Sequence, residues 1–238
     1  MSSMAPRRLG IMRLLRHGDI NWLHPGGDLS TVAFFFGTIL CVRELIIGVD
    51  EAGRGPLAGP VAVGVVAVPL GFDILREFPG VRDSKLLSAQ KREVIFAEVE
   101  RRSRQGDLRY CVRLTPAEYI DRYGITKAVR RGVWGGVRRL AEAEQSLVLL
   151  DGLLRAPNEY TQRTIIKGDY KVPVIALASV VAKVTRDRLM ERLSEMYSEY
   201  GFEQHKGYGT DAHYRAIRAH GLCDIHRKSF CTIQKTGV

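Results

Sequence analysis

Three apolar runs of this sequence, each containing β-branched residues, end in aspartate or glutamate. The runs and their acidic ends are LIIGV with Asp50 and Glu51, LVLL with Asp151, and RTIIKG with Asp169. Short runs of this composition predict strands. A single aspartate after a strand is usually a turn former. If these strand ends meet at one edge of a sheet, however, the four carboxylates repel one another unless divalent cations neutralise them. Oxygen-only ligands favour hard ions such as Mg²⁺ or Mn²⁺.

Other segments from Leu45 onward show strand and helix patterns in alternation. We predict strands at 45–49, 61–68, 108–114, 147–151 and 163–169, and helices at 88–104, 116–124, 124–145, 175–200 and 210–221. Ser88 is expected to cap its helix, and Thr115 with Glu118 to form a capping box. The glycines at 132, 135 and 136 imply close packing of the fourth helix segment. The order predicts an α/β domain with a mixed central sheet flanked by helices.

Composition narrows the class of protein. A chain of 238 residues that is 45% hydrophobic can bury a sizeable core, and its length suits one globular domain or one domain with an appendage. Lys and Arg outnumber Asp and Glu by 36 to 26, which makes a polyanionic partner plausible. The four cysteines form no CxxC pair and no HExxH motif is present, so neither a zinc site nor a disulfide framework is expected.

Residues 1–43 lack the regular strand and helix pattern that begins at Leu45. We predict an N-terminal extension there, followed by a catalytic domain at 44–238. The apolar run at 32–42 is too short to span a bilayer and resembles a signal peptide poorly. We therefore expect no membrane association and a cytoplasmic location.

The run DEAGRGPLAGP, from Asp50 to Pro60, joins the first two predicted strands. Adjacent residues of a strand point to opposite faces, so Asp50 and Glu51 share a site only if the strand stops or bends there. Gly53 and Gly55 permit a bend and expose backbone to a nucleic-acid strand, while Arg54 offers a charge to phosphate. The loop lacks the GxxxxGK of a nucleotide P-loop.

Seven motifs, in order along the chain, resemble those of the ribonuclease HII family between Glu44 and Ile233. They are DEAGRGPLAGP, DSK at 83–85, LLDG at 149–152, KGD at 167–169, ASVVAKVTRD at 178–187, HKGYGT at 205–210 and HRKSF at 226–230. The resemblance implies a ribonuclease H-like fold. It leaves the segment before Glu44 unmatched.

The resemblance also assigns roles. Asp50, Glu51, Asp151 and Asp169 match the catalytic, metal-binding carboxylates; Gly53, Arg54 and Gly55 match a loop that senses the 2′-hydroxyl; Lys85 matches a phosphate contact; and Tyr208 matches a tyrosine that stacks on the sugar after the ribonucleotide. Two Mg²⁺ or Mn²⁺ ions are implied, with Asp50 the best candidate to bridge them. Arg186 and Asp187 also fit an exposed helix pair, and for His205 and His226 we expect structural roles.

The implied enzyme is a monomeric endonuclease that cuts the RNA strand of RNA/DNA hybrids. It also nicks DNA on the 5′ side of embedded ribonucleotides, leaving 3′-hydroxyl and 5′-phosphate ends. Alternatives are a ribonuclease HIII-like hybrid nuclease, a junction resolvase, or an inactive nucleic-acid-binding module on the same fold. No QxxLxxFF-like segment follows Phe230, so binding to a sliding clamp is not predicted.

Overall fold

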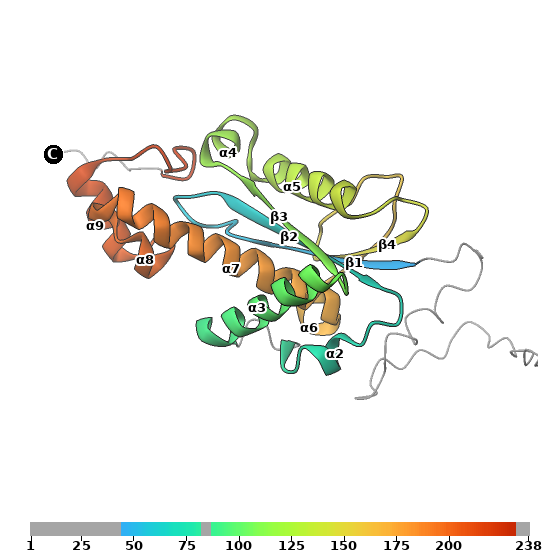
Figure 1. Ribbon diagram of the computed structural model, residues 1–238. Coiled ribbons are helices and arrows are strands. Elements are labelled where there is room, and N and C mark those ends of the chain that lie inside the picture. Colours follow the sequence, from blue (N-terminus) through green and yellow to red (C-terminus); the bar gives the residue numbers. More distant parts are fainter. Residues whose placement is uncertain (1–43, 82–86, 232–238) are drawn as a thin grey trace, which may run out of the picture.

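The computed structural model describes residues 44–81 and 87–231, which form a five-stranded sheet covered by helices (Figure 1). The strands are β1 (Leu45–Ala52), β2 (Val61–Pro69), β3 (Arg109–Thr115), β4 (Ser146–Asp151) and β5 (Thr161–Ile165). The helices are α2 (Ile74–Glu77), α3 (Ala89–Gln105), α4 (Ala117–Tyr123), α5 (Ile125–Leu140), α6 (Gly168–Lys171), α7 (Pro173–Met196), α8 (Phe202–His205) and α9 (Asp211–His220), with a 3₁₀ turn, η2, at Ser198–Tyr200. The predicted 1–43 extension and Lys85 lie outside the described residues.

The strand order is β3-β2-β1-β4-β5, with β1–β2 and β2–β3 antiparallel and β1–β4 and β4–β5 parallel. The predicted mixed sheet is therefore confirmed. The central strands β1 and β2 are buried almost throughout and the edge strands are partly exposed, which explains why β1 and β2 lack a polar alternation.

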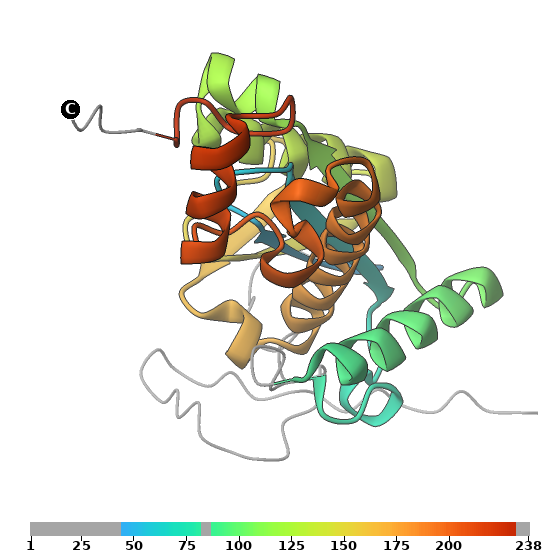
Figure 2. The ribbon, with the colours of Figure 1, turned by 90° about the vertical axis from the view of Figure 1, so that its left-hand side faces the viewer.

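Helices cover both faces of the sheet. Figures 1 and 2 show α4 and α5 over one face and α3 and α7 over the other. One apolar core joins the sheet to α2, α3 and α7, and a second joins it to α4 and α5. A third core lies at one end, where η2, α8 and α9 meet the last part of α7.

The glycines of α5 permit the close packing predicted for them. A Cβ on Gly132 would stand 2.6 Å from Val63 Cγ2, and one on Gly136 would stand 2.6 Å from Val65 Cγ2. The helix lies against β2 at a spacing that only glycine allows. It ends at Leu140 rather than at the predicted residue 145.

Helix α7 approaches the other face equally closely. A Cβ on Gly64 of β2 would meet the carbonyl oxygen of Ala178 at 2.2 Å. This packing places the first part of α7 against the region of the sheet where Gly64 pairs with Asp50. None of the helices in the described part of the chain is long and apolar enough to cross a bilayer.

Two of the predicted caps have different outcomes. Ser88 caps α3 as predicted, since its Oγ accepts a hydrogen bond from the Lys91 amide at 3.2 Å. The capping box at Thr115 is wrong: Pro116 is the N-cap of α4, and no side chain caps it. Thr115 is the last residue of β3, and its hydroxyl donates to the Ala128 carbonyl instead.

Candidate active site

The parallel pairing of β1 with β4 brings two of the predicted acidic ends together. The pairing runs to Val49 opposite Leu150, so Asp50 and Asp151 are the next residues on neighbouring strands. A pocket of about 440 Å³ opens at this edge. Its lining is Asp50, Glu51, Ala52, Gly53, Arg54, Gly55, Arg92, Asp151, Ser179, Val180, Lys183 and Tyr208.

Asp50 and Glu51 both line this pocket, although β1 does not stop between them. The strand continues to Ala52 through its pairing with β2, while the side facing β4 is open beyond Val49. Of the two possibilities predicted, a stop of the strand between Asp50 and Glu51 is therefore wrong. The chain turns immediately afterwards, at Gly53, whose φ of 86° lies in the left-handed region that suits glycine.

The Asp50 carboxyl lies in surroundings that disfavour its charged form. It is 5% exposed, and burial, followed by the nearby Glu51 charge, raises its pKa from 3.8 to about 8. Hydrogen bonds from the Ser179 side chain and the Glu51 amide oppose the rise only in part. The ionised form of Asp50 therefore requires a compensating positive charge.

Burial also raises the pKa of Glu51, against the attraction of Arg54, whose Nη1 lies 3.2 Å from Glu51 Oε1. The second oxygen, Oε2, is buried and makes no hydrogen bond within the described residues. The nearby Asp151 charge raises the pKa values of both Asp50 and Glu51 further.

Asp151 and Asp169 are linked through Gly168. Asp151 Oδ1 accepts a hydrogen bond from the Gly168 amide at 2.6 Å, so the residue before Asp169 touches the pocket carboxylate directly. Asp169 does not end a strand as predicted. β5 stops at Ile165, and Lys167 adopts a left-handed φ of 56°. The fully buried Asp169 lies in the first turn of α6 and is not among the residues that line the pocket.

The donor chemistry of this site fits hard divalent cations. Its carboxylates supply only oxygen, burial raises the pKa values of Asp50 and Glu51, and Glu51 Oε2 is a buried acceptor without a donor in the described residues. Within the described ranges, no three His, Cys, Asp or Glu side chains are already oriented as a ligand cluster. Asp50, Glu51 and Asp151 each accept a hydrogen bond from a protein donor on one carboxylate oxygen.

Two buried arginines hold the backbone of the glycine-rich run from Asp50 to Pro60. Sequence reasoning gave Arg227 no role and left Arg186 open between a motif residue and an exposed helix pair. Arg227 donates to the carbonyl oxygens of Gly53, Arg54 and Gly59 at 2.7, 2.9 and 2.9 Å. Arg186 donates to those of Pro60 and Ala58 at 2.9 and 3.1 Å.

Both arginine side chains are completely buried, so the alternative of an exposed helix pair is wrong for Arg186. Burial, followed by the charge of Arg186, lowers the pKa of Arg227 to about 9. An arginine among the apolar residues of α7 was the available signal, but its partners lie more than a hundred residues away in the chain.

Tyr208 also lines the pocket. Its side chain is 42% exposed, and Arg186 Cζ and Lys183 Nζ lie 5.8 and 5.9 Å from the ring centroid. Its loop is tied to the glycine-rich loop, since the Leu57 amide donates to the Gly207 carbonyl at 2.8 Å. The structure thus brings Gly53, Arg54, Gly55 and Tyr208 together with three of the four predicted carboxylates.

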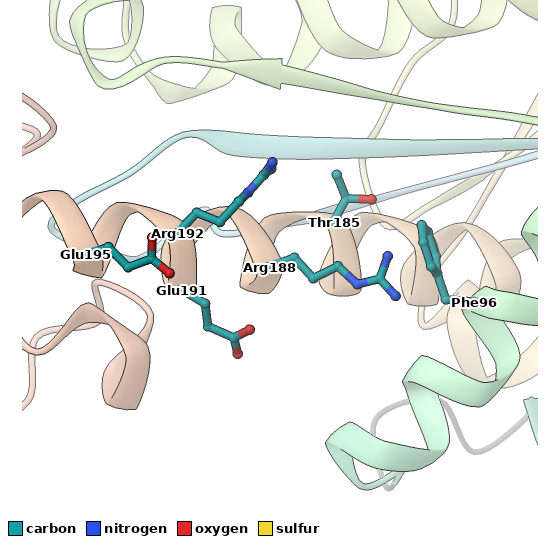
Figure 3. Close-up of a pocket in the computed structure, with 6 residues that line it drawn as sticks. All are labelled: Phe96, Thr185, Arg188, Glu191, Arg192 and Glu195. Atoms are coloured by element: carbon teal, nitrogen blue, oxygen red, sulfur yellow. The ribbon is translucent and has the colours of Figure 1, made fainter.

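A second hollow, of about 510 Å³, lies between α3 and α7 (Figure 3). Arg188 stands 4.7 Å from the Phe96 ring centroid there, while Arg192, Glu191 and Glu195 project from α7. It contains none of the predicted site residues, and its acidic side chains alternate with basic ones, so we assign no catalytic role to it.

Comparison with known proteins identifies the family. The sequence profile of ribonuclease HII matches residues 47–233. The chain belongs to the ribonuclease HII family. A ribonuclease HII of Bacillus cereus is 44% identical over 189 residues, which cover 79% of this chain and 70% of that protein. The protein is accordingly a metal-dependent endoribonuclease, and the resemblance seen in the motifs is confirmed.

Solved structures confirm the ribonuclease H-like α/β fold. RNase HII of Archaeoglobus fulgidus, solved in a complex with PCNA, has a TM-score of 0.63 and 28% identity, covering 81% of this chain and 98% of that one. Ribonuclease H2 of Pyrococcus horikoshii has a TM-score of 0.60 and 27% identity, covering 78% and 93%. Bst-RNase HIII, solved with Mn²⁺, is 20% identical and has a TM-score of 0.55. The superposition covers 76% of this chain and 66% of the HIII chain, and it shows a shared fold alone.

Proposed function

We propose that this ribonuclease nicks DNA on the 5′ side of an embedded ribonucleotide and cuts the RNA strand of RNA/DNA hybrids. The observation that carries the proposal is a single pocket in which Asp50, Glu51 and Asp151 face the Gly53–Gly55 loop and the Tyr208 ring. We assign the whole activity to residues 44–238, with residues 1–43 as an extension.

Asp50, Glu51 and Asp151, completed by Asp169, are the residues that would hold Mg²⁺ or Mn²⁺. The chemistry that two such ions would supply there is activation of a water molecule and stabilisation of the leaving 3′ oxygen, and the products would carry 3′-hydroxyl and 5′-phosphate ends. The protein's own contribution is a partly buried acidic pocket that keeps these carboxylates together at the ends of β1 and β4. Burying them raises the pKa of Asp50 and therefore increases the advantage of a bound cation.

The orientation of the glycine-rich loop supports 2′-hydroxyl recognition. Arg227 binds the carbonyl oxygens of Gly53 and Arg54, and the described chain contains no cis peptide. In a trans peptide the N–H points opposite to the C=O, so the amides of Arg54 and Gly55 face away from Arg227. Two backbone donors on a loop that lines the pocket suit a ribose hydroxyl, and such recognition is independent of base sequence.

The test uses three duplexes of identical sequence: DNA with one ribonucleotide, a continuous RNA/DNA hybrid, and all DNA. We expect cleavage of the first two in Mg²⁺ or Mn²⁺, none in chelator, and no cleavage of the third. Mass spectrometry of the products checks the ends. Cleavage of four-way DNA in preference to these duplexes would favour a resolvase, and cleavage of the hybrid alone would favour a ribonuclease HIII-like activity.

Tyr208 tests the recognition of the single ribonucleotide separately. Removing a stacking ring costs about 1–3 kcal/mol, so Tyr208→Ala should reduce kcat/KM on the single ribonucleotide more than on the hybrid. Tyr208→Phe, which keeps the ring, should retain the preference. Equal losses on both substrates with a large fall in melting temperature would make Tyr208 a structural anchor.

A further inference from the structure

Three histidine rings lie against one another beside the backbone of Tyr208. His205 ends α8, His213 lies in the first turn of α9, and His226 follows α9. The rings of His205 and His213 are stacked with centroids 4.5 Å apart, and the centroids of His213 and His226 are 5.2 Å apart. His213 and His226 are buried and pack against Phe202.

His226 and His213 form a chain of hydrogen bonds in which each group donates to the next, from the Cys223 amide to the Tyr208 carbonyl. The Cys223 amide donates to His226 Nδ1 at 3.0 Å, the two Nε2 atoms of His226 and His213 are 3.0 Å apart, and His213 Nδ1 is 2.9 Å from the Tyr208 carbonyl oxygen. A backbone amide only donates and a carbonyl only accepts, so the ends of this chain fix both tautomers. His226 must carry its proton on Nε2, and His213 must carry its proton on Nδ1.

His205 is fixed in the same way and holds the other side of the same dipeptide. The Gly207 amide donates to His205 Nδ1 at 3.2 Å, and His205 Nε2 donates to the Tyr200 carbonyl at 2.9 Å. The segment Gly207–Tyr208 is therefore held at its N–H by one imidazole and at its C=O by the imidazole stacked on it.

The arrangement tolerates no positive charge on the His213–His226 pair. An added proton on His213 would set two N–H groups against each other across the 3.0 Å contact, and turning the His226 tautomer would set its Nδ1–H against the Cys223 amide. Burial lowers the pKa of His213 to about 4 and also lowers that of His226, so both are neutral at pH 7. The other titratable groups against the pair are His205, Tyr200 and Cys223.

We propose that His213, with its proton held on Nδ1 by His226, is a positioning residue that sets the Tyr208 ring for recognition of a single ribonucleotide. This inference rests on the proposed function of Tyr208. It predicts that the preference for the single-ribonucleotide duplex over the hybrid depends on the Nδ1–H donor of residue 213 and not on the bulk of its ring.

Two substitutions separate these contributions. Asparagine places its amide near the position of Nδ1, so His213→Asn keeps a donor to the Tyr208 carbonyl. Glutamine reaches the position of Nε2, so His213→Gln keeps a partner for His226 and loses that donor. Both remove the buried ring, and we expect similar falls in melting temperature. His220→Gln, on the exposed side of α9, is the matched control.

The measurements are kcat/KM on the single-ribonucleotide and hybrid duplexes, together with imidazole ¹⁵N spectra of the substrate-free protein at pH 7. We expect a Nδ1–H tautomer for His213 and Nε2–H tautomers for His205 and His226. His213→Gln should reduce the preference for the single ribonucleotide about tenfold, His213→Asn should retain it, and His213→Gln should have no further effect on the preference in a Tyr208→Ala background.

Equal changes in preference for the Asn and Gln variants, or other tautomers, would overturn the inference. If Tyr208→Ala shifts the preference and His213→Gln does not, the positioning role fails while the proposed function stands. If Tyr208→Ala itself leaves the preference unchanged, the proposed role of Tyr208 fails first, and the positioning role falls with it.

Discussion

Arg227 holds Gly53 across 174 residues of sequence, with its Nη2 donating to the Gly53 carbonyl oxygen at 2.7 Å. The same guanidinium binds the carbonyls of Arg54 and Gly59. Because Arg227 fixes the peptide planes of the loop, it also fixes the direction of the amides that face the substrate in our proposal.

Arg227→Lys should therefore damage both stability and recognition. A lysine cannot reach three carbonyls in this geometry, and each buried carbonyl left without a donor costs about 1–3 kcal/mol. We expect a fall of about 2–4 kcal/mol in the free energy of unfolding, and a larger loss of kcat/KM on the single-ribonucleotide duplex than on the hybrid. Arg218→Lys, on the exposed face of α9, is the control. An Arg227→Lys variant with the unfolding free energy and the kcat/KM values of the wild type would contradict the role of Arg227 in fixing this loop.

Gly53 and Gly55 should respond differently to alanine. A Cβ on Gly53 would lie 2.1 Å from Arg186 Nε at a φ of 86°, whereas a Cβ on Gly55 meets nothing within 4 Å. Gly53→Ala should lower the melting temperature, because a left-handed non-glycine residue alone costs about 1–2 kcal/mol. Gly55→Ala should fold normally and raise KM if substrate approaches this backbone. Normal KM for Gly55→Ala would remove Gly55 from the recognition surface.

The Asp50 carboxyl should make the stability of the metal-free protein depend on pH. Its folded-state pKa is raised to about 8 from 3.8, so the folded protein retains a proton that the unfolded chain releases, and stability falls as pH rises through this window. In chelator at pH 8, Asp50→Asn should therefore melt at a higher temperature than the wild type, with a much smaller difference at pH 4.

Divalent ions should make the wild type melt at a higher temperature than Asp50→Asn, the reverse of the order expected in chelator. Mg²⁺ or Mn²⁺ should raise the wild-type melting temperature at pH 8 and affect Asp50→Asn much less, since ligand binding to the folded state alone is stabilising. Glu144→Gln, which changes an exposed carboxylate, should behave as the wild type. A wild type that is more stable than Asp50→Asn in chelator, with no response to either ion, would argue against a metal site at Asp50.

The sequence predicted those residues of the site whose position follows from a short run of neighbouring residues. The acidic ends at Asp50, Glu51 and Asp151 were found because each stands at the end of an apolar run that forms a buried strand, and parallel pairing of β1 with β4 then sets two of them side by side. Asp169 was misplaced because β5 ends at Ile165 and the chain enters α6 through a left-handed Lys167, which an apolar run does not reveal.

Long-range contacts were beyond prediction. Thr115 has the sequence of a helix cap, yet its pairing with Val61 in the sheet prevails over the local preference. Arg186 and Arg227 have charged side chains that usually indicate surface, and only the folded chain shows the distant carbonyls that satisfy them. The hydrogen-bonded chain that runs from the Cys223 amide through His226 and His213 to the Tyr208 carbonyl is likewise visible only in the folded protein.

The most direct test of the proposed catalysis is the single-turnover cleavage rate of Asp151→Asn on DNA containing one ribonucleotide, at saturating Mg²⁺. Asparagine keeps an oxygen for the Gly168 amide, so the fold and substrate affinity should persist. Loss of the charge that holds the cation should slow cleavage on the order of 100-fold or more. A rate close to that of the wild type would contradict a metal-dependent centre built on Asp151.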